Sequence, residues 1–257
     1  MSTKRTQALP GGNSAERAAA KETIWRLSAI ALGHPTPELQ SAIEQGSFHE
    51  AFDTAWSTVT GRPWPRALAS RDFAHLEAGY ITAFLHGPVG KPIASLLAGD
   101  HESLLAGLSR PVFMLNISAF YRHFGLQAAT GDEGRNDEPD HLASMLEFMA
   151  VLAHLESRTL ARGRDPADSR RAQRDFLQRY LSPLLYTVAE GLRERPAGKL
   201  DRTLAQLVSE LPDWASGQIA ELEARVGPYH DTDAARSNPG LGAEGRKARV
   251  IDQNLWG

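Results

Sequence analysis

An acidic run followed by histidine is the part of the sequence best equipped for chemistry. It opens the stretch NDEPDHLASMLEFMAVLAH (136–154), whose later residues have the apolar spacing of a helix. Carboxylates accept the planar fork of an arginine side chain in a bidentate arrangement, so exposed acids beside His141 could bind a partner's guanidinium groups. Only Arg135 opposes the acidic residues of this region, which are Asp132, Glu133, Asp137, Glu138 and Asp140.

Helix capping is a second interpretation of the same residues. Pro139 suits the first helical position, which places Asp137 or Glu138 at the N-cap and Asp140 in the first turn. The helix dipole stabilises acids there, but a charged imidazole at His141 gains nothing from it. Capping and the binding of guanidinium groups therefore both remain open on the residues alone, and the binding interpretation requires Asp140 to be exposed.

An acid/base pair made of Asp140 and His141, as in a small-molecule enzyme, is a third interpretation. No nucleophile or metal-binding set accompanies that pair: the sequence has no cysteine, no G-x-S-x-G motif and no P-loop. Gly240 to Gly245 match G-x-G-x-x-G, but they follow Ser-Asn-Pro rather than a strand. We therefore expect no catalytic residues, no cofactor-binding residues and no metal site.

Composition narrows the class of protein. The 257 residues carry a net charge of -3, which argues against a generally basic nucleic-acid binder. No apolar run approaches the length of a membrane span, and Lys4-Arg5 are not followed by the apolar region of a secretory signal. The absence of cysteine fits a reducing compartment. We expect a soluble cytoplasmic protein with no nucleic-acid partner and no membrane insertion.

Apolar residues recur at helical spacing through most of the chain, and no convincing period-2 strand interrupts them. This pattern predicts an all-α single domain of roughly eight to ten helices. We expect a flexible leader over 1–18, the helical domain over 19–227 and a polar, flexible tail over 228–257.

Local signals predict where individual helices begin and end. Thr36-Pro37 has the form of an N-cap, and Ser47 to Glu50 has the form of a capping box. Pro183 is expected to kink or break a long helix that starts at Asp165-Pro166. Two shorter helices are expected after that, one around 200–208 and one around 214–226.

An arginine-rich stretch follows the quoted helix. It is interpreted as a solvated connector or, alternatively, as an anion-binding surface that could contact a cofactor of a partner protein. Its arginines are Arg158, Arg162, Arg164, Arg170, Arg171 and Arg174, with Asp165, Asp168 and Asp175 opposing them.

The stretch EPDHLASMLEFMAVLAH resembles the E-P-D-H-[IL]-x-x-x-L-E-[FY]-M signature of the TorD/DmsD/NarJ-type chaperones, which mature molybdenum oxidoreductases. YITAFLHGPVGKP (80–92) is similar to the family's Y-x-x-L-F-x-G-P-x-x-x-P segment, and YRHFGL (121–126) to its Y-x-x-F-G-L stretch. FLQRYLSPLLYTVAEGL (176–192) resembles its F-x-x-x-H-L-x-P-W helix, although Tyr180 and Leu184 replace the histidine and tryptophan. Ile93-Ala94-Ser95 replace the proline-rich continuation of the second segment.

This resemblance implies an all-helical TorD-like bundle that is cytoplasmic and not an enzyme. Members bind the apo catalytic subunit of a molybdopterin-guanine-dinucleotide oxidoreductase, often through its twin-arginine signal peptide, and hold it back from export until the cofactor is loaded. The chain itself would carry no cofactor and would be a monomer or a helix-swapped dimer. A helical adaptor with no connection to twin-arginine export is the alternative with the same fold.

The resemblance also implies a binding site. An acidic receptor would hold the arginines of the signal peptide, and an apolar groove would hold its hydrophobic region. The receptor residues would be Glu138, Pro139, Asp140 and His141, extended by Glu147 about two turns along the helix. The groove would be lined or shaped by Tyr80, Phe84, Leu85, Gly87 and Pro88.

Overall fold

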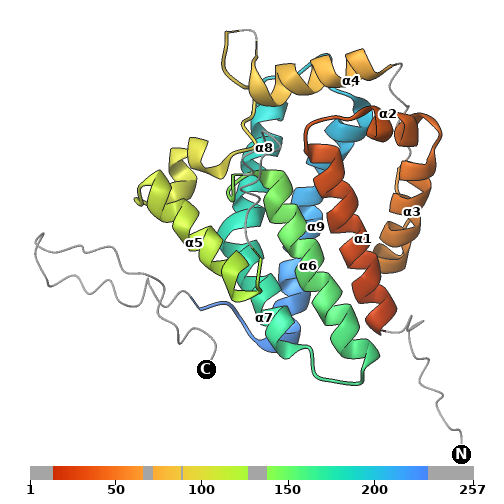
Figure 1. The fold of residues 1–257 in the computed structure, drawn as a ribbon, viewed down its shortest axis with the longest axis vertical. Helices are drawn as coiled ribbons and strands as arrows, with labels where there is room; N and C mark the ends of the chain where they lie inside the picture. The colour runs from red at the N-terminus through yellow and green to blue at the C-terminus, as the bar shows by residue number, and fades with distance from the viewer. Residues whose placement is uncertain (1–13, 66–71, 88, 127–137, 231–257) are drawn as a thin grey trace, which may run out of the picture.

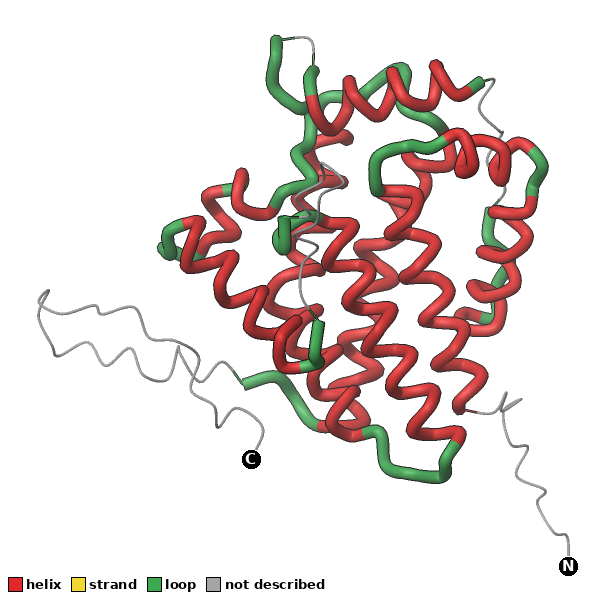
Figure 2. The backbone as a smooth tube through the Cα atoms, in the orientation of Figure 1, coloured by secondary structure: helices red, strands yellow, loops and turns green. Residues whose placement is uncertain are grey.

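The computed structural model describes residues 14–65, 72–87, 89–126 and 138–230, and these are almost entirely helical (Figures 1 and 2). The all-α prediction is confirmed. The first helix begins at Ser14, inside the range assigned to the leader, while most of the leader and nearly all of the tail lie outside the described residues. The α-helices are α1 (Ser14–Leu32), α2 (Pro37–Glu44), α3 (Ser47–Thr60), α4 (Phe73–Tyr80), α5 (Arg110–His123), α6 (Leu142–Ala161), α7 (Ala167–Phe176), α8 (Ser182–Glu194) and α9 (Arg202–Val226).

Shorter elements join these helices. Ile81–Leu85 and Leu177–Leu181 are π-helical turns, labelled η1 and η4, and Ala98–Asp100 and Glu102–Leu105 are 3₁₀ turns, labelled η2 and η3. None of the helices in the described residues has the length and apolarity needed to cross a membrane.

The centre of the fold is the antiparallel pair α1 and α6, which lie side by side in Figure 1. The apolar stripe of α6 is buried as its spacing predicts, and each of its six predicted residues is fully inaccessible: Leu142, Met145, Leu146, Met149, Leu152 and Ala153. Helix α9 joins this core through Trp214, whose ring centroid lies 4.2 Å from that of Trp25 on α1.

Helix α5 stands to one side of the bundle and is attached mainly by aromatic side chains (Figure 1). Phe113 and Phe120 meet the rings of Tyr180 and Phe176 edge-on at centroid distances of 5.6 Å. Since edge-to-face ring pairs are favourable and directional, these contacts fix how α5 is held against α7 and η4.

Helix ends follow the sequence signals in one case and depart from them in another. The Thr36 hydroxyl accepts the N–H of Leu39, so the predicted N-cap of α2 is confirmed. The predicted capping box of Ser47 is wrong: Gly46, with φ of 84°, precedes α3, and the Ser47 hydroxyl donates to the Ala42 carbonyl instead. Only Gln45 and Gly46 separate α2 from α3, so Ser47 is already inside the helix.

Neither Pro183 nor Pro212 breaks its helix. The long helix is not broken at Pro183: α7, η4 and α8 follow one another without a gap, Pro183 lies in the first turn of α8, and the departure from α-helix is the π-helical turn over Leu177–Leu181. The prediction of two separate helices after residue 200 is wrong, since α9 runs unbroken through Pro212. Pro212 is buried, so packing against the core compensates for the hydrogen bond that proline removes.

A partly buried ionic cluster ties the N-terminal part of α1 to the C-terminal part of α9. The Glu221 carboxylate lies 3.1 Å from both the Lys21 ammonium and the Arg17 guanidinium. Burial disfavours the charged form of Glu221, but the two cations outweigh burial and lower its pKa from 4.5 to about 2. Burial dominates at Lys21, which is 4% exposed, and lowers the pKa of that ammonium.

The depressed pKa of Glu221 predicts a pH-dependent contribution to stability. The stabilisation is complete above the ordinary pKa of glutamate and is lost as the pH falls toward the folded-state value. We therefore expect the difference in unfolding free energy between the wild type and Glu221→Gln to narrow from about pH 5 to about pH 3. Urea unfolding at a series of pH values measures it, and a difference that stays constant with pH would contradict the ion-pair assignment.

Candidate functional site

The acidic stretch does not form the first turn of α6, contrary to the capping prediction. The helix begins at Leu142, and its N-cap is His141, whose Nδ1 accepts the N–H of Ala143 at 3.1 Å. Because Nδ1 is the acceptor, a neutral His141 carries its proton on Nε2. His141 therefore caps the helix, a role that the argument from the helix dipole did not predict.

A backbone pairing holds the acidic stretch out of the helix. The Asp140 carbonyl accepts the N–H of Ala98 at 3.0 Å, and the Leu142 N–H donates to the Leu96 carbonyl at 2.8 Å. These bonds form an isolated antiparallel bridge between Leu97 and His141. The Glu-Pro-Asp-His stretch is thus fastened to the chain segment before α5.

Asp140 is fully buried, so the requirement that it be exposed is not met. Its Oδ2 accepts the N–H of Gly99 at 2.8 Å, across 41 residues of sequence. A Cβ atom on Gly99 would lie 2.7 Å from that oxygen and 2.6 Å from Nε of Arg110, so a larger residue there would displace one of these two side chains. The Asp140 carboxylate therefore positions backbone, and a partner cannot reach it in this conformation.

The exposed part of the site is an ion cluster around Arg110, which we call the Arg110 cluster: Arg110, Asp100, Glu138 and Asp140. The guanidinium donates to Asp100 Oδ1 at 3.1 Å and to Glu138 Oε2 at 2.5 Å, and it lies 4.0 Å from Asp140 Oδ2. The side chains of Asp100 and Glu138 are 36% and 41% exposed. Three carboxylates thus converge on one guanidinium, with two of them open to solvent.

Neighbouring hydroxyl groups hold the cluster in place. The Tyr121 hydroxyl donates to the Pro139 carbonyl at 2.7 Å, and the Ser95 hydroxyl donates to Asp100 Oδ2 at 2.6 Å. Burial, followed by the negative charges of Asp140 and Glu147, raises the pKa of Tyr121 well above its usual value. The phenol therefore stays protonated as a donor, and Glu147 is exposed on α6 close enough to act on it.

The predicted apolar groove is not formed by the residues assigned to it. Tyr80 and Phe84 are each 2% exposed, and their rings pack edge-on in the core with centroids 5.1 Å apart. Leu85 is 40% exposed, Gly87 is half-buried, and Pro88 lies outside the described residues. In this chain the segment builds part of the core and a tight turn, since a Cβ atom on Gly87 would lie 2.4 Å from the Lys91 carbonyl oxygen.

The π-helical turn η1 connects this segment to the Arg110 cluster. Its wider turn leaves the Ala83 carbonyl free to accept the N–H groups of Ile93 and Ala94 at 2.9 and 3.0 Å. The Ile93 carbonyl in turn accepts from the Arg195 guanidinium of the α8 C-cap. The connection from α4 to Ser95 is therefore fixed by hydrogen bonds, which positions the residues that follow it.

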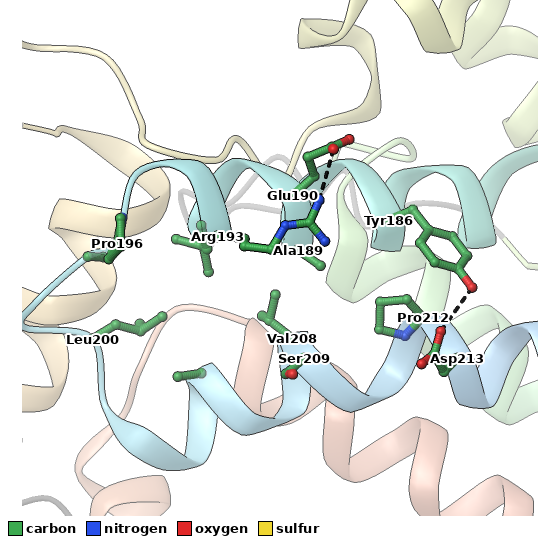
Figure 3. Close-up of a pocket in the computed structure, with 13 residues that line it drawn as sticks. Tyr186, Ala189, Glu190, Arg193, Pro196, Leu200, Val208, Ser209, Pro212 and Asp213 are labelled. Atoms are coloured by element: carbon green, nitrogen blue, oxygen red, sulfur yellow. Dashed lines mark hydrogen bonds and ion pairs between the residues drawn. The ribbon is translucent and has the colours of Figure 1, made fainter.

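Sequence reasoning missed a hollow of about 520 Å³ between α8 and α9, lined by both polar and apolar side chains (Figure 3). The feature of the sequence that could have indicated this hollow is a set of small or apolar residues on the facing sides of the two helices. The Tyr186 hydroxyl donates to Asp213 at 3.2 Å at one end. The hollow is lined by Tyr186, Ala189, Glu190, Leu192, Arg193, Pro196, Ala197, Leu200, Ala205, Val208, Ser209, Pro212 and Asp213.

The arginine-rich stretch divides into structural and exposed members. Arg170 donates to the buried carboxylate of Glu156 at 2.7 Å, and Arg174 donates to the Gly227 carbonyl after α9 at 2.7 Å. These two arginines are used inside the fold and cannot belong to an anion-binding surface. Arg158, Arg162 and Arg164 are exposed around the end of α6. Among the described residues no group of acidic, histidine or cysteine side chains could hold a metal ion.

Comparison with known protein families assigns the sequence to one of them. Residues 36–190 match the family described as nitrate reductase delta subunit, a range that includes the η1 segment, the Arg110 cluster and most of α8. The chain belongs to this family. The resemblance to TorD/DmsD/NarJ-type chaperones that the Glu-Pro-Asp-His stretch predicts is confirmed.

Curated relatives agree with one another in their names. The chain is 54% identical over 241 residues to the dimethyl sulfide dehydrogenase assembly chaperone protein of Rhodovulum sulfidophilum, with 94% of each chain covered. It is 30% identical over 207 residues to the perchlorate reductase assembly chaperone protein of Dechloromonas aromatica (strain RCB), covering 77% of this chain and 89% of that one. The selenate reductase assembly chaperone protein of Thauera selenatis is 37% identical over 133 residues, covering 51% of this chain and 63% of that protein.

No solved structure matches the chain significantly. The relatives are named for assembly and not for catalysis, which agrees with the prediction that the chain is not an enzyme.

Proposed function

We propose that this chain is an assembly chaperone for the catalytic subunit of a molybdenum oxidoreductase and acts in the cytoplasm before that subunit is exported. The similarity to the dimethyl sulfide dehydrogenase chaperone, which extends over 94% of both chains, carries the proposal. It favours a client, meaning the subunit being assembled, of the dimethyl sulfide dehydrogenase type. The client would hold the molybdopterin guanine dinucleotide, and the chaperone would hold no cofactor.

The contact with the client's twin-arginine signal peptide is proposed at the open edge of the Arg110 cluster. Glu138 and Asp100 supply solvent-accessible carboxylates, and Glu147 adds negative charge on the neighbouring surface of α6. Asp140, Pro139 and His141 position these groups through the bridge to residues 96–98. This division differs from the sequence prediction, in which Asp140 and His141 bind the arginines directly.

The hydrophobic region of the signal peptide needs exposed apolar side chains, and several lie on the segments that adjoin the cluster in sequence. Leu108 and Leu115, which flank and belong to α5, are 41% and 59% exposed, and Arg110 lies between them in sequence. Leu85 and Val89, at 40% and 83% exposed, belong to the segment that leads into the cluster. These side chains replace Tyr80 and Phe84 as the proposed apolar contacts.

Capture from the source cells tests this function. The tagged wild type is expected to retain a molybdoenzyme catalytic subunit, identified by mass spectrometry, and Glu138→Gln to retain about tenfold less, since a charge-assisted hydrogen bond is lost. Glu190→Gln is the matched control, because Glu190 is an exposed, arginine-paired carboxylate on α8. If the wild type captures no such subunit under conditions that preserve weak complexes, the proposal fails.

A further inference from the structure

The Arg110 cluster already contains a guanidinium, and it comes from the chain itself. Two exposed carboxylates, Asp100 and Glu138, hydrogen-bond that guanidinium, and the buried Asp140 lies 4.0 Å from it. The carboxylates of the cluster therefore already bind a guanidinium group, which is the same group that an arginine of the client would present.

We infer that Arg110 is an internal competitor, which occupies the acidic receptor in the free chaperone and is displaced when a guanidinium of the client binds Asp100 and Glu138. This inference rests on the proposed function, because it assigns the regulation of the same contact. It gives Arg110 a defined role. The affinity for the client is set by the difference between the free energy with which the client's guanidinium binds these carboxylates and the free energy with which Arg110 binds them.

Several features make Arg110 displaceable. Its side chain is 36% exposed, so an incoming group and water can reach it. It is the first residue of α5, where the helix dipole disfavours a cation. The preceding turn contains Ala106 with φ of 49°, a left-handed conformation that costs a non-glycine residue energy, followed by Gly107 with φ of 80°.

The cluster also has capacity beyond its present occupant. Three carboxylates facing one guanidinium leave a formal charge of -3 + 1 = -2. The second carboxylate oxygen of Asp140 is buried and has no hydrogen-bond partner among the described residues, so Asp140 adds its charge from beneath while Asp100 and Glu138 make the direct contacts. An additional cation is therefore favoured electrostatically, and its arrival weakens the attachment of Arg110.

Displacement would also be transmitted through the fold. Arg110 joins η2, through Asp100, to the stretch before α6, through Glu138, and it begins the peripheral helix α5. Release of the guanidinium leaves α5 attached mainly by its aromatic contacts with α6, α7 and η4. Client binding is then coupled to a looser α5 and a newly accessible surface beneath its first turn.

The test compares four proteins binding one synthetic peptide, which has an Arg-Arg pair ahead of an apolar segment. Calorimetric titration of the wild type, Arg110→Gln, Arg110→Lys and Arg122→Gln measures each affinity. Arg122 is the matched control because it is exposed near the other end of α5 and its replacement changes the net charge equally. Arg110→Gln removes the internal competitor, so a larger fraction of the protein molecules has a receptor that is open to the peptide. Binding is therefore expected to tighten about tenfold. Arg110→Lys keeps a cation but loses the guanidinium fork, so its affinity is expected to lie between those of the wild type and Arg110→Gln.

The outcomes separate the inference from the proposed function. Equal affinities for Arg110→Gln and Arg122→Gln would show an effect of net charge alone and overturn the inference. Weaker binding by a folded Arg110→Gln would show that Arg110 organises the receptor, and this also overturns it. If none of the four proteins binds the peptide, the proposed signal-peptide contact fails, and the inference fails with it.

Discussion

Gly79→Ala is expected to destabilise the fold by about 3 kcal/mol, at the upper end of the cost of overpacking a core. A Cβ atom at this position of α4 would lie 2.3 Å from the Lys199 carbonyl oxygen and 3.2 Å from the Leu200 Cα. Both contacts are with backbone, so no side chain can rotate away, and α4 must separate from the turn before α9. Because η1 continues directly from α4, this separation also disturbs the segment that positions the Arg110 cluster.

Gly217→Ala is the matched control for that prediction. Gly217 lies in the interior of α9, it is exposed, and a Cβ atom there meets nothing within 4 Å. The same chemical change should stabilise the protein by about 0.5–1 kcal/mol, the difference in helix propensity between alanine and glycine. Urea unfolding of both variants measures the contrast, and a Gly79→Ala variant as stable as the wild type would show that α4 does not pack as described.

Asp140→Ala has the second large expected effect, a loss of about 2–3 kcal/mol of unfolding free energy. The substitution leaves the N–H of Gly99 without its carboxylate acceptor and removes a buried charge from beside Arg110. Glu138→Gln should cost less than about 1 kcal/mol, because Glu138 forms a partly exposed ion pair. Equal stabilities of the two variants would contradict the structural role of Asp140.

This difference in stability decides how binding experiments are interpreted. An Asp140→Ala variant that loses its client would be reporting a damaged fold, since the Asp140 carboxylate holds Gly99 directly beside the backbone bridge between residues 96–98 and 140–142. Glu138→Gln separates the effects, because it removes one open carboxylate and leaves that bridge in place.

Sequence reasoning succeeds here where the determinants are local. The spacing of Met145, Met149 and Leu152 fixes which face of α6 is buried, and Thr36 followed by Pro37 specifies an N-cap from adjacent residues. Such patterns depend on the geometry of one helix, so the all-α class and most of the helix positions could be predicted.

The candidate site was only partly predictable, because its determinants are distant in the sequence. The acidic run looks like a helix start, and nothing within it indicates that Ala98 and Gly99 supply hydrogen-bond donors 41 or 42 residues away. Arg110 gives no local signal either, since its partners lie 10 and 28 residues from it. Tyr80 and Phe84 match a family pattern, but in this chain both side chains are buried in the core and do not line an open groove.

The central claim, that the open edge of the Arg110 cluster receives the arginines of the client, is tested most directly by NMR mapping. The ¹⁵N-labelled full chain would be titrated with the Arg-Arg peptide and, separately, with its Lys-Lys counterpart. We predict that the Arg-Arg peptide causes the largest shift changes at the amides of Gly99, Asp100 and Glu138 and at the Nε–H of Arg110, and that the Lys-Lys peptide causes weaker changes. If the largest changes instead line the α8–α9 hollow, at Ala189, Ala205 and Ser209, the receptor lies there and the account is contradicted.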